Sequence, residues 1–488
     1  MPVLDNLMPQ SVFRYFEALC AIPHGSRNTS AIADFCVAVA EFHGLECWKD
    51  SANNVVIISP ATPGYERAEP LILQGHLDMV CEKEAGANID MDRDGLRLRL
   101  KGDFISADGT TLGGDDGIAV AMILAIVENQ SIPHPRLECV LTSDEEIGML
   151  GAAAFDASGL QGRRMLNLDS ETEGIFTTGC AGGCTAVCAI PPRWESAKFD
   201  ALHISIRGLT GGHSGMEIRH GRANANKLLG RILQEIGRER DYRLVRADGG
   251  AKDNAIPVAA DAEIVTREPL SVRRAAERCA ADLKREFAHT DPKMSIEVLD
   301  SVAVMCMDAA STKRVTEFLA SAPDGVQSMS ADLPDLVQTS LNLGILKTSP
   351  EAVSASFCVR SSDAAEKSAL LERLRALTES PAGRRKNKDA IAGQMTISGD
   401  YPAWKYAPFS PIRSLCAEVF ETLYRTPPKI EAIHAGLECG YFADKIRGLD
   451  CVSLGPDILD IHTPRERLRV SSTQRVWRFL LEVLKRAT

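Results

Sequence analysis

The sequence predicts an α/β protein in which a mixed sheet, covered by helices on both faces, is interrupted by an inserted α+β domain. Three observations lead to this fold class. At 488 residues, the chain is longer than one hydrophobic core usually serves. Strand-like and helical runs alternate over the first 190 or so residues. The pattern changes near residue 200 and returns after about residue 390.

The first part of the chain alternates helices and strands. Its N-terminal segment has apolar residues at helical spacing, at Val12, Phe13, Phe16 and Leu19. Short runs rich in β-branched and aliphatic residues predict strands at 53–59, 71–76, 137–143 and 164–169. The apolar stretch at 117–129 predicts a buried helix.

The second part has a different pattern. Strands are expected at 202–208, 262–268, 294–300, 339–347 and 352–360, and helices at 223–239 and from 271. The polar stretch 380–389 ends this pattern, and a helix near 411–425, a strand at 451–455 and a helix at 473–486 follow. We therefore expect one domain formed by 1–198 and 391–488, with 199–390 inserted into it.

The composition excludes several classes of protein. The net charge of −11 comes without a concentrated Lys/Arg patch, which disfavours nucleic acid and anionic membranes as partners. No run approaches 18 consecutive apolar residues, and the N-terminus lacks the pattern of a signal peptide. The 14 cysteines are scattered, which is typical of reduced thiols in a cytoplasmic protein, and Cys180, Cys184 and Cys188 are interpreted as packing residues.

Acidic and histidine residues follow the predicted strands where those strands end. They are His76 and Asp78 after the second strand, Glu145 and Glu146 after the third, Asp169 after the fourth, and His462 after the strand at 451–455. Asp115 lies on a Gly-rich turn that opens the apolar helix. Ligands bind beyond the carboxyl ends of strands in open α/β sheets, so these side chains are expected to meet there.

Such a group of carboxylates and imidazoles is expected to bind cations, because the uncompensated charges of the carboxylates would repel one another. One carboxylate that bridges two ions would give each ion three protein ligands and leave room for a shared water. Imidazole and carboxylate ligands without thiolate suit Zn²⁺, and Co²⁺ or Mn²⁺ also fit. Each short motif taken alone is more often structural than functional.

The motifs in their order resemble the aminoacyl-histidine dipeptidases of the M20 metallopeptidase family, from about residue 10 to the C-terminus. The resemblance rests on GHLDMV, GTTLGGDDGIAVA, TSDEEIGMLGA, LNLDSETEG, GCAGG, GLTGGHSG, NANKLL, NAIP, HAGLECG and IHTP. It implies a metal-binding catalytic domain and an inserted lid domain that also serves dimerisation. By this resemblance Asp115 bridges both ions, with His76 and Asp169 at the first and Glu146 and His462 at the second.

The same resemblance assigns the remaining catalytic roles. Glu145 would be the general base, and a residue beside a ligand in a Glu-Glu pair has suitable geometry for that role. Asp78 would lie behind the His76 imidazole and fix its tautomer. Two departures from the family pattern are the acidic Asp116, which we interpret as a helix-start residue, and the arginines Arg465 and Arg467 after His462.

In the inserted domain, the resemblance indicates residues that contact the substrate. His213, in a Gly-rich turn, would polarise the scissile carbonyl or stabilise the oxyanion, unless it is a loop histidine without a role. Arg360 would bind the C-terminal carboxylate of the substrate, the alternative being a solvated strand-end arginine. Asn254 and Gly436 are further candidates, with His434 and Glu438 nearby.

The sequence therefore predicts metal-dependent hydrolysis of dipeptides of the Xaa-His kind by a homodimer. The rival within enzymes is a deacylase or aminoacylase on the same scaffold. The rival from another class is a non-catalytic metal-binding regulatory protein, against which the intact set of ligands argues. The residue preferred before His stays open.

Overall fold

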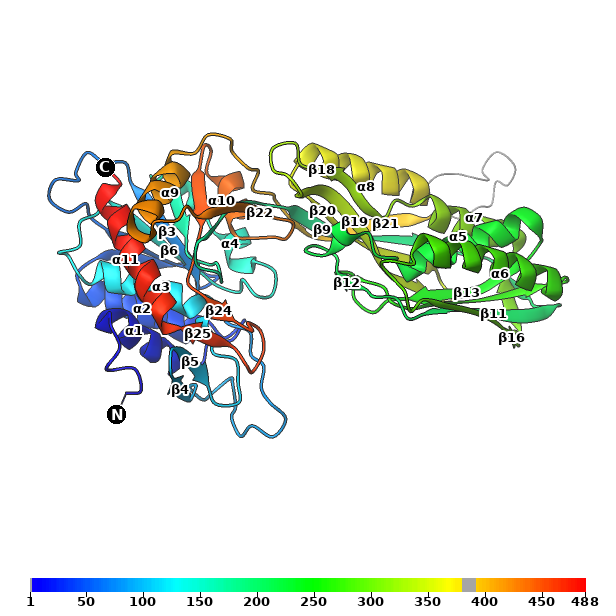
Figure 1. Cartoon of the computed structure of the whole chain (residues 1–488), viewed down its shortest axis with the longest axis horizontal. Coiled ribbons are helices and arrows are strands. Elements are labelled where there is room, and N and C mark those ends of the chain that lie inside the picture. Colours follow the sequence, from blue (N-terminus) through cyan, green and yellow to red (C-terminus); the bar gives the residue numbers. More distant parts are fainter. Residues whose placement is uncertain (1, 380–391) are drawn as a thin grey trace. The chain divides into compact units, whose positions relative to one another are not determined.

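The computed structural model describes residues 2–379 and 392–488. The chain forms two compact units, and each is described by itself. The first comprises Met1–Cys180, Trp404–Ala432 and Leu437–Thr488, and the second comprises Ala181–Ala403 and Ile433–Gly436. In Figure 1 the first unit carries the blue, cyan, orange and red parts of the chain, and the second the green and yellow parts.

The first unit is an α/β structure. Its helices are α1 (Gln10–Cys20), α2 (Ser30–Phe42), α3 (Gly114–Val127), α4 (Leu150–Ala154), α9 (Pro411–Tyr424), α10 (Cys439–Lys445) and α11 (Val470–Arg486). Its strands are β1 (Glu46–Lys49), β2 (Val55–Ser59), β3 (Leu71–His76), β4 (Leu98–Lys101), β5 (Phe104–Ala107), β6 (Leu137–Thr142), β7 (Arg164–Asn167), β8 (Ile175–Cys180), β22 (Lys429–Ile433), β23 (Asp450–Ser453), β24 (Ile458–Leu459) and β25 (Arg467–Arg469).

Its main sheet is mixed, as the sequence predicts. Eight strands follow the order β1-β2-β6-β3-β7-β23-β8-β22. The central strands β6, β3, β7 and β23 run parallel, whereas β2 and β8 are antiparallel to their inner neighbours. The register places His76 opposite Thr142 and Gln74 opposite Asn167. The strands expected at 71–76 and 137–143 are confirmed as β3 and β6.

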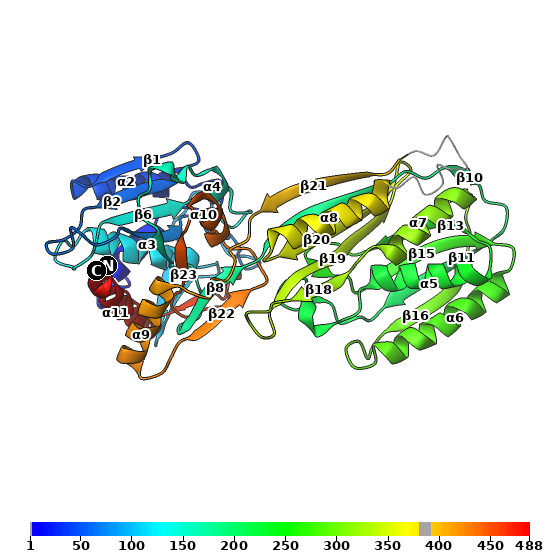
Figure 2. The ribbon, with the colours of Figure 1, turned by 90° about the horizontal axis from the view of Figure 1, so that it is seen from above.

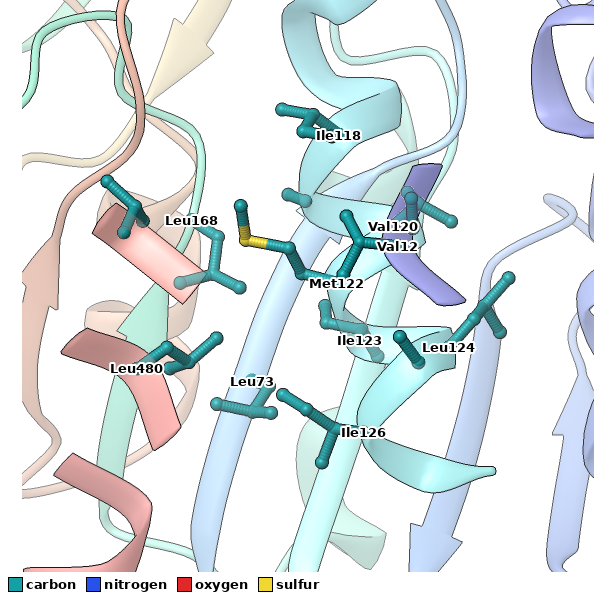
Figure 3. Close-up of a cluster of buried hydrophobic side chains, with 14 of the residues drawn as sticks. Val12, Leu73, Ile118, Val120, Met122, Ile123, Leu124, Ile126, Leu168 and Leu480 are labelled. Carbon is teal, nitrogen blue, oxygen red and sulfur yellow. The ribbon is translucent and has the colours of Figure 1, made fainter. Parts of the chain in front are cut away.

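The core of this unit surrounds α3. Every residue of this helix is buried, because its sequence GIAVAMILAIV is apolar on all sides. The helix packs against β3 and α1. Figure 3 shows Val12 of α1, Leu73 of β3 and Leu480 of α11 around its side chains. The apolar helix thereby fixes its own N-terminal turn, which carries Asp115, beside the end of β3.

The second unit is an antiparallel sheet covered by helices. Its strands are β9 (Gly182–Ile190), β10 (Trp194–Ser196), β11 (Asp200–Arg207), β12 (Gly212–His213), β13 (Arg243–Gly249), β14 (Ala255–Ile256), β15 (Ala260–Thr266), β16 (Ser295–Ser301), β17 (Met305–Met307), β18 (Gly325–Met329), β19 (Val337–Thr348), β20 (Val353–Ser361) and β21 (Gln394–Tyr401). The helices α5 (Ala225–Glu239), α6 (Pro269–Glu286), α7 (Ala309–Ser321) and α8 (Ala364–Glu379) lie over one face of the large sheet (Figure 2).

Both boundaries of the second unit differ from the expected 198/199 and 390/391. The unit begins at Ala181 and runs to Ala403. The reason is that β9 and β21 pair with each other in its nine-stranded sheet, whose path is β16-β11-β15-β13-β19-β20-β9-β21 with β18 beside β19. The polar stretch at 380–389 and the boundary expected at 390 lie outside the described residues.

Candidate metal centre

The first unit gathers polar side chains at one edge of its main sheet. His76 is the last residue of β3, Glu145 and Glu146 follow β6, and Asp169 follows β7. Because these strands are parallel, their carboxyl ends meet at the same edge. Asp115 reaches this edge from the start of α3, where its backbone is not yet helical (φ −82°, ψ 103°).

The carboxylate of Asp115 lies between two imidazoles. Its Oδ1 is 3.1 Å from Nε2 of His76, and its Oδ2 is 3.2 Å from Nε2 of His462. Asp169 Oδ1 lies 3.6 Å from the same His76 nitrogen, and Glu146 Oε1 lies 3.0 Å from that of His462. The structure thus brings these five residues together as two clusters that share Asp115.

Among the described residues, three groups of donor atoms could hold a metal ion, the atoms of each group lying within 4.8 Å of one another. They are His76 with Asp116 and Asp169, His76 with Glu145 and Glu146, and Asp115 with Glu146 and His462. The donors are nitrogen and oxygen, without thiolate, which is the set that Zn²⁺, Mn²⁺ and Co²⁺ accept.

The charges of this edge also fit cations. Hydrogen bonds that the His462 imidazole donates to the Asp115 and Glu146 carboxylates raise the pKa of His462 to about 10. Burial opposes protonation of His76, but the Asp169 charge and the Asp115 hydrogen bond outweigh it and raise the pKa of His76 well above its usual value. Both shifts show that the carboxylates favour positive charge at this edge, which divalent ions would supply.

Asp78 contacts both the His76 imidazole and the turn that carries Glu145 and Glu146. Its Oδ1 accepts the backbone N–H of Glu145 at 2.8 Å, and its Oδ2 accepts that of Glu146 at 3.2 Å. The His76 Nδ1 lies 2.9 Å from the main-chain oxygen of Asp78 and 3.6 Å from its carboxylate. The imidazole is therefore oriented mainly by the Asp78 carbonyl, while the carboxylate fixes the Glu145–Glu146 turn.

Asp116 lies in the first turn of α3, as the sequence indicates, but it does not face solvent. Its side chain is buried, and its Oδ2 accepts the backbone N–H of His76 at 3.1 Å. Burial and the nearby charge of Asp169 raise the pKa of Asp116 well above its usual value. The backbone at Asp116 is still non-helical (φ −116°, ψ 24°), which turns the carboxyl inward toward β3. Asp116 therefore braces the end of β3.

A network of buried polar side chains lies on the same strands, at residues that shortly precede His76 and Asp169 in the sequence. Gln74 Nε2 and Thr142 Oγ1 both donate to Glu438 Oε2 at 2.6 Å, and Asn167 Nδ2 donates to Gln74 Oε1 at 2.5 Å. Burial chiefly raises the pKa of Glu438 to about 8. These bonds join α10 to β3, β6 and β7, and so tie the HAGLECG segment to the strands that carry His76 and Asp169.

Of the two arginines after His462, Arg467 binds a carboxylate of its own loop and Arg465 faces solvent. Arg467 Nη2 donates to Asp460 Oδ2 at 2.8 Å, and its guanidinium lies 5.4 Å from the Phe104 ring centroid. The Arg465 side chain is exposed. Arg467 is therefore engaged by its own carboxylate partner.

In the second unit, His213 presents a defined tautomer. Its Nδ1 accepts the backbone N–H groups of Gly215 and Met216, each at 3.2 Å. Burial and the charge of Arg360 lower the pKa of His213. The neutral imidazole consequently carries its proton on Nε2, which can act as a donor.

Arg360 lies among polar groups of the same unit. Its Nη1 donates to the Tyr401 hydroxyl at 3.0 Å, and its buried Nε has no partner among the described residues. Burial and the Arg360 charge lower the pKa of His434 to about 3, and His434 Nε2 lies 2.7 Å from Ser340 Oγ. This arginine is 9% exposed, so it is not the solvated strand-end residue that the sequence left as an alternative.

The other two candidates contribute less. The main-chain oxygen of Asn254 accepts the N–H of Ser214 at 2.9 Å, while the Asn254 side chain is exposed. Gly436 ends the short segment Ile433–Gly436 that belongs to the second unit. Within residues 2–379 and 392–488, no helix is long and apolar enough to cross a membrane.

Comparison with known proteins identifies the class. The sequence profile of Peptidase family M20/M25/M40 matches residues 72–486, and the chain belongs to this family. The cytosol non-specific dipeptidase of Escherichia coli (strain K12) is 35% identical over 492 residues, which cover 99% of each protein.

Solved structures agree with this membership. The crystal structure of aminoacylhistidine dipeptidase from Vibrio alginolyticus matches with a TM-score of 0.92 at 33% identity, covering 99% of this chain and 98% of that one. The aminopeptidase PepT of Bacillus cereus matches with a TM-score of 0.57 at 15% identity, covering 99% of both chains, which shows a shared fold.

Proposed function

We propose that this protein hydrolyses dipeptides, Xaa-His peptides among them, at a site that holds two divalent ions. The observation that carries the proposal is the Asp115 carboxylate, whose two oxygens face His76 and His462 separately. The relatives that match over nearly the whole chain are a non-specific dipeptidase and an aminoacylhistidine dipeptidase.

The ligand assignment follows the two clusters. His76 and Asp169 would hold one ion and Glu146 and His462 the other, with Asp115 shared between them. Zn²⁺ suits these donors best, and Co²⁺ or Mn²⁺ are the alternatives. The ions would polarise the scissile carbonyl and acidify the attacking water.

Glu145 is the proposed general base. Asp78 fixes its backbone through the 2.8 Å bond, and its carboxylate belongs to a donor group with His76 and Glu146. From there Glu145 takes a proton from the attacking water and delivers it to the leaving amine. Desolvation, with the charge of Asp169, raises the pKa of Glu145 well above its usual value, which favours its retaining a transferred proton.

The second unit would supply groups that bind the substrate. His213, with its proton on Nε2, would donate to the scissile carbonyl or to the oxyanion. Arg360 would bind the C-terminal carboxylate, a task suited to a buried guanidinium with an unpartnered Nε. Asn254 and Gly436 are proposed to line the same substrate path.

We further propose a cytoplasmic homodimer that forms through the second unit. Strand β16 lies at the edge of the nine-stranded sheet, and the nearby Leu299, Val302 and Val304 are 51%, 88% and 80% exposed. Exposed apolar side chains along a sheet edge are typical of interaction sites. Free cysteines throughout the described chain fit a reducing compartment.

The substrate panel tests the reaction. Xaa-His dipeptides, other dipeptides and N-acyl amino acids should be offered to the protein loaded with each metal in turn. We expect cleavage of dipeptides, including the Xaa-His members, and little turnover of N-acyl amino acids. Preferred cleavage of the N-acyl amino acids would identify a deacylase instead.

Metal removal tests the shared carboxylate. We expect chelation to abolish activity and add-back to restore it, with two ions bound per chain at saturation by elemental analysis. Asp115→Asn should weaken binding of both ions, because it removes a charged ligand from each cluster. Full activity with one ion per chain would contradict the bridging role. Failure to bind any divalent ion would favour a non-catalytic regulatory protein that retains only the fold.

A further inference from the structure

Glu466 is a buried carboxylate that binds the turn on which Asp115 stands. Its side chain is 2% exposed. Oε2 accepts the backbone N–H groups of Leu112 and Gly113 at 2.8 and 3.2 Å, and Oε1 accepts those of Gly114 and Asp115 at 2.8 and 3.4 Å. One side chain therefore satisfies four successive backbone donors.

The turn is shaped to receive a carboxylate. Gly113 adopts a left-handed backbone (φ +66°), which lets consecutive N–H groups converge. A Cβ atom at Gly114 would lie 3.2 Å from Glu466 Oε1, so the absence of a side chain there lets the carboxylate approach. Leu112 and Gly113 precede α3, and Gly114 and Asp115 lie in its first turn, where backbone N–H groups have no partner within the helix. Glu466 supplies that partner from far along the chain.

Glu466 and His462 belong to the same short loop. Strands β24 and β25 pair as a hairpin, with Ile458 opposite Leu468, and the loop between them carries both residues. The N–H of Glu466 donates to the Thr463 carbonyl at 3.0 Å, which makes the loop a compact turn. Glu466 thus joins the loop that carries His462 to the turn that carries Asp115.

From these contacts we infer that Glu466 is a positioning residue for the metal pair. It sets the separation between the Asp115 carboxylate and the His462 imidazole, two groups that come from distant parts of the sequence. Both carboxylate oxygens of Glu466 are occupied by backbone donors, so it acts through these residues rather than as a ligand. The inference rests on the proposed function, because it takes Asp115 and His462 as ligands.

Glu466→Gln tests this role, since it keeps the size of the side chain but removes the charge and one acceptor. The amide nitrogen of the glutamine would face two of the four backbone N–H donors, which it cannot accept. The turn that carries Asp115 and the loop that carries His462 should therefore move apart. We expect the weaker of the two ions to bind 10- to 100-fold less tightly, measured by calorimetric titration of Mn²⁺ into chelator-treated protein. An excess of Mn²⁺ should restore full occupancy of the weaker site.

Glu138→Gln is the matched control. Glu138 is also fully buried, and it accepts the backbone N–H groups of Gln161 and Gly162, at 2.9 and 2.8 Å to Oε2, near the start of β6. Both substitutions should lower the melting temperature of the metal-free protein. Only Glu466→Gln should change Mn²⁺ affinity. Equal Mn²⁺ affinities in the wild type and Glu466→Gln would overturn the inference and leave Glu466 as a structural residue.

Glu466→Asp keeps the test decisive if Glu466→Gln does not fold. It retains the charge but is one methylene shorter, so it reaches fewer of the donors, and we expect a smaller loss of affinity for the same ion. Unchanged affinity in this variant would also overturn the inference. A wild-type chain that binds fewer than two ions would contradict the proposed function itself, which separates the two failures.

Discussion

Replacing Glu145 by Gln should leave both ions bound and lower kcat by on the order of 10²-fold or more. The amide has nearly the shape of the carboxylate, but it cannot accept a proton from the attacking water. The turn should persist, because Asp78 binds the backbone N–H of Glu145 and not its side chain. Steady-state kinetics with a cleaved dipeptide, together with metal analysis of the same preparation, measure both effects.

Asp144→Asn is the matched control for this variant. Asp144 precedes Glu145 in the same turn, and its Oδ1 accepts the backbone N–H of Arg27. The substitution removes a neighbouring negative charge of the same kind but no proposed proton acceptor, so kcat should stay within a few-fold of the wild type. Near-normal turnover of Glu145→Gln would exclude Glu145 as the base. Loss of metal from that variant would instead assign it a role as a ligand.

The edge of the sheet that carries the site could be predicted from the sequence because the signals there are local. His76 ends an apolar run, and Glu145, Glu146 and Asp169 follow others. The rule that parallel strands present their carboxyl ends at one edge then brings them together. The pairing of Asp115 with both imidazoles depended on the family resemblance, because nothing local fixes which carboxylate is shared.

Other features could not be predicted because they depend on contacts between distant segments. The hydrogen bonds that the backbone N–H groups of Leu112 and Gly114 donate to Glu466 join residues more than 350 positions apart in the chain. In the sequence, Arg465 and Arg467 stand out as departures from the family pattern. In the structure, it is Glu466 between them that is buried. The signal that could have found it is the glycine pair at 113–114, which leaves backbone donors uncovered.

The domain boundary was misplaced for a related reason. Strand β9 begins with two glycines and is rich in small residues, GGCTAVCAI, which weakens the strand signal in its sequence. Its alternate residues, Cys184, Ala186 and Cys188, nevertheless face the core of the second unit. Cys184 and Cys188, two of the three cysteines interpreted as packing residues, therefore lie inside the sheet that defines that unit, whereas Cys180 ends β8 of the first unit. Pairing with β20 and β21 makes the segment a strand.

Asp116 shows how burial changes the meaning of a local pattern. An acidic residue at a helix start ordinarily gains from the helix dipole while solvated. Here α3 is buried along its entire length, so its first turn is buried as well. The carboxyl then needs a protein donor and finds it in the N–H of His76.

His213→Ala should lower kcat sharply, on the order of 10²-fold or more, and leave the metal content unchanged. The residue belongs to the second unit, while the proposed metal ligands belong to the first. Removing a donor to the oxyanion slows the reaction without touching a ligand. His220→Ala is a matched control, because His220 is an exposed histidine of the same segment. It should keep kcat near the wild-type value.

Two routes could bring His213 to the substrate, and mixed dimers separate them. It could act on its own chain after closure of the second unit, or on a partner chain across a two-fold interface. In the second case, a dimer of one His213→Ala chain and one Glu145→Gln chain contains one site that receives both an intact base and an intact histidine.

The decisive measurement is activity after subunit exchange between these two inactive variants. For random exchange, half of the dimers are mixed and each has one intact site, so we expect recovery of about a quarter of wild-type activity if sites are shared. Exchange is verified with two differently tagged chains, and sedimentation establishes that the protein is a dimer. No recovery in a verified mixture would mean that His213 acts within its own chain, because every mixed dimer would then have both sites damaged.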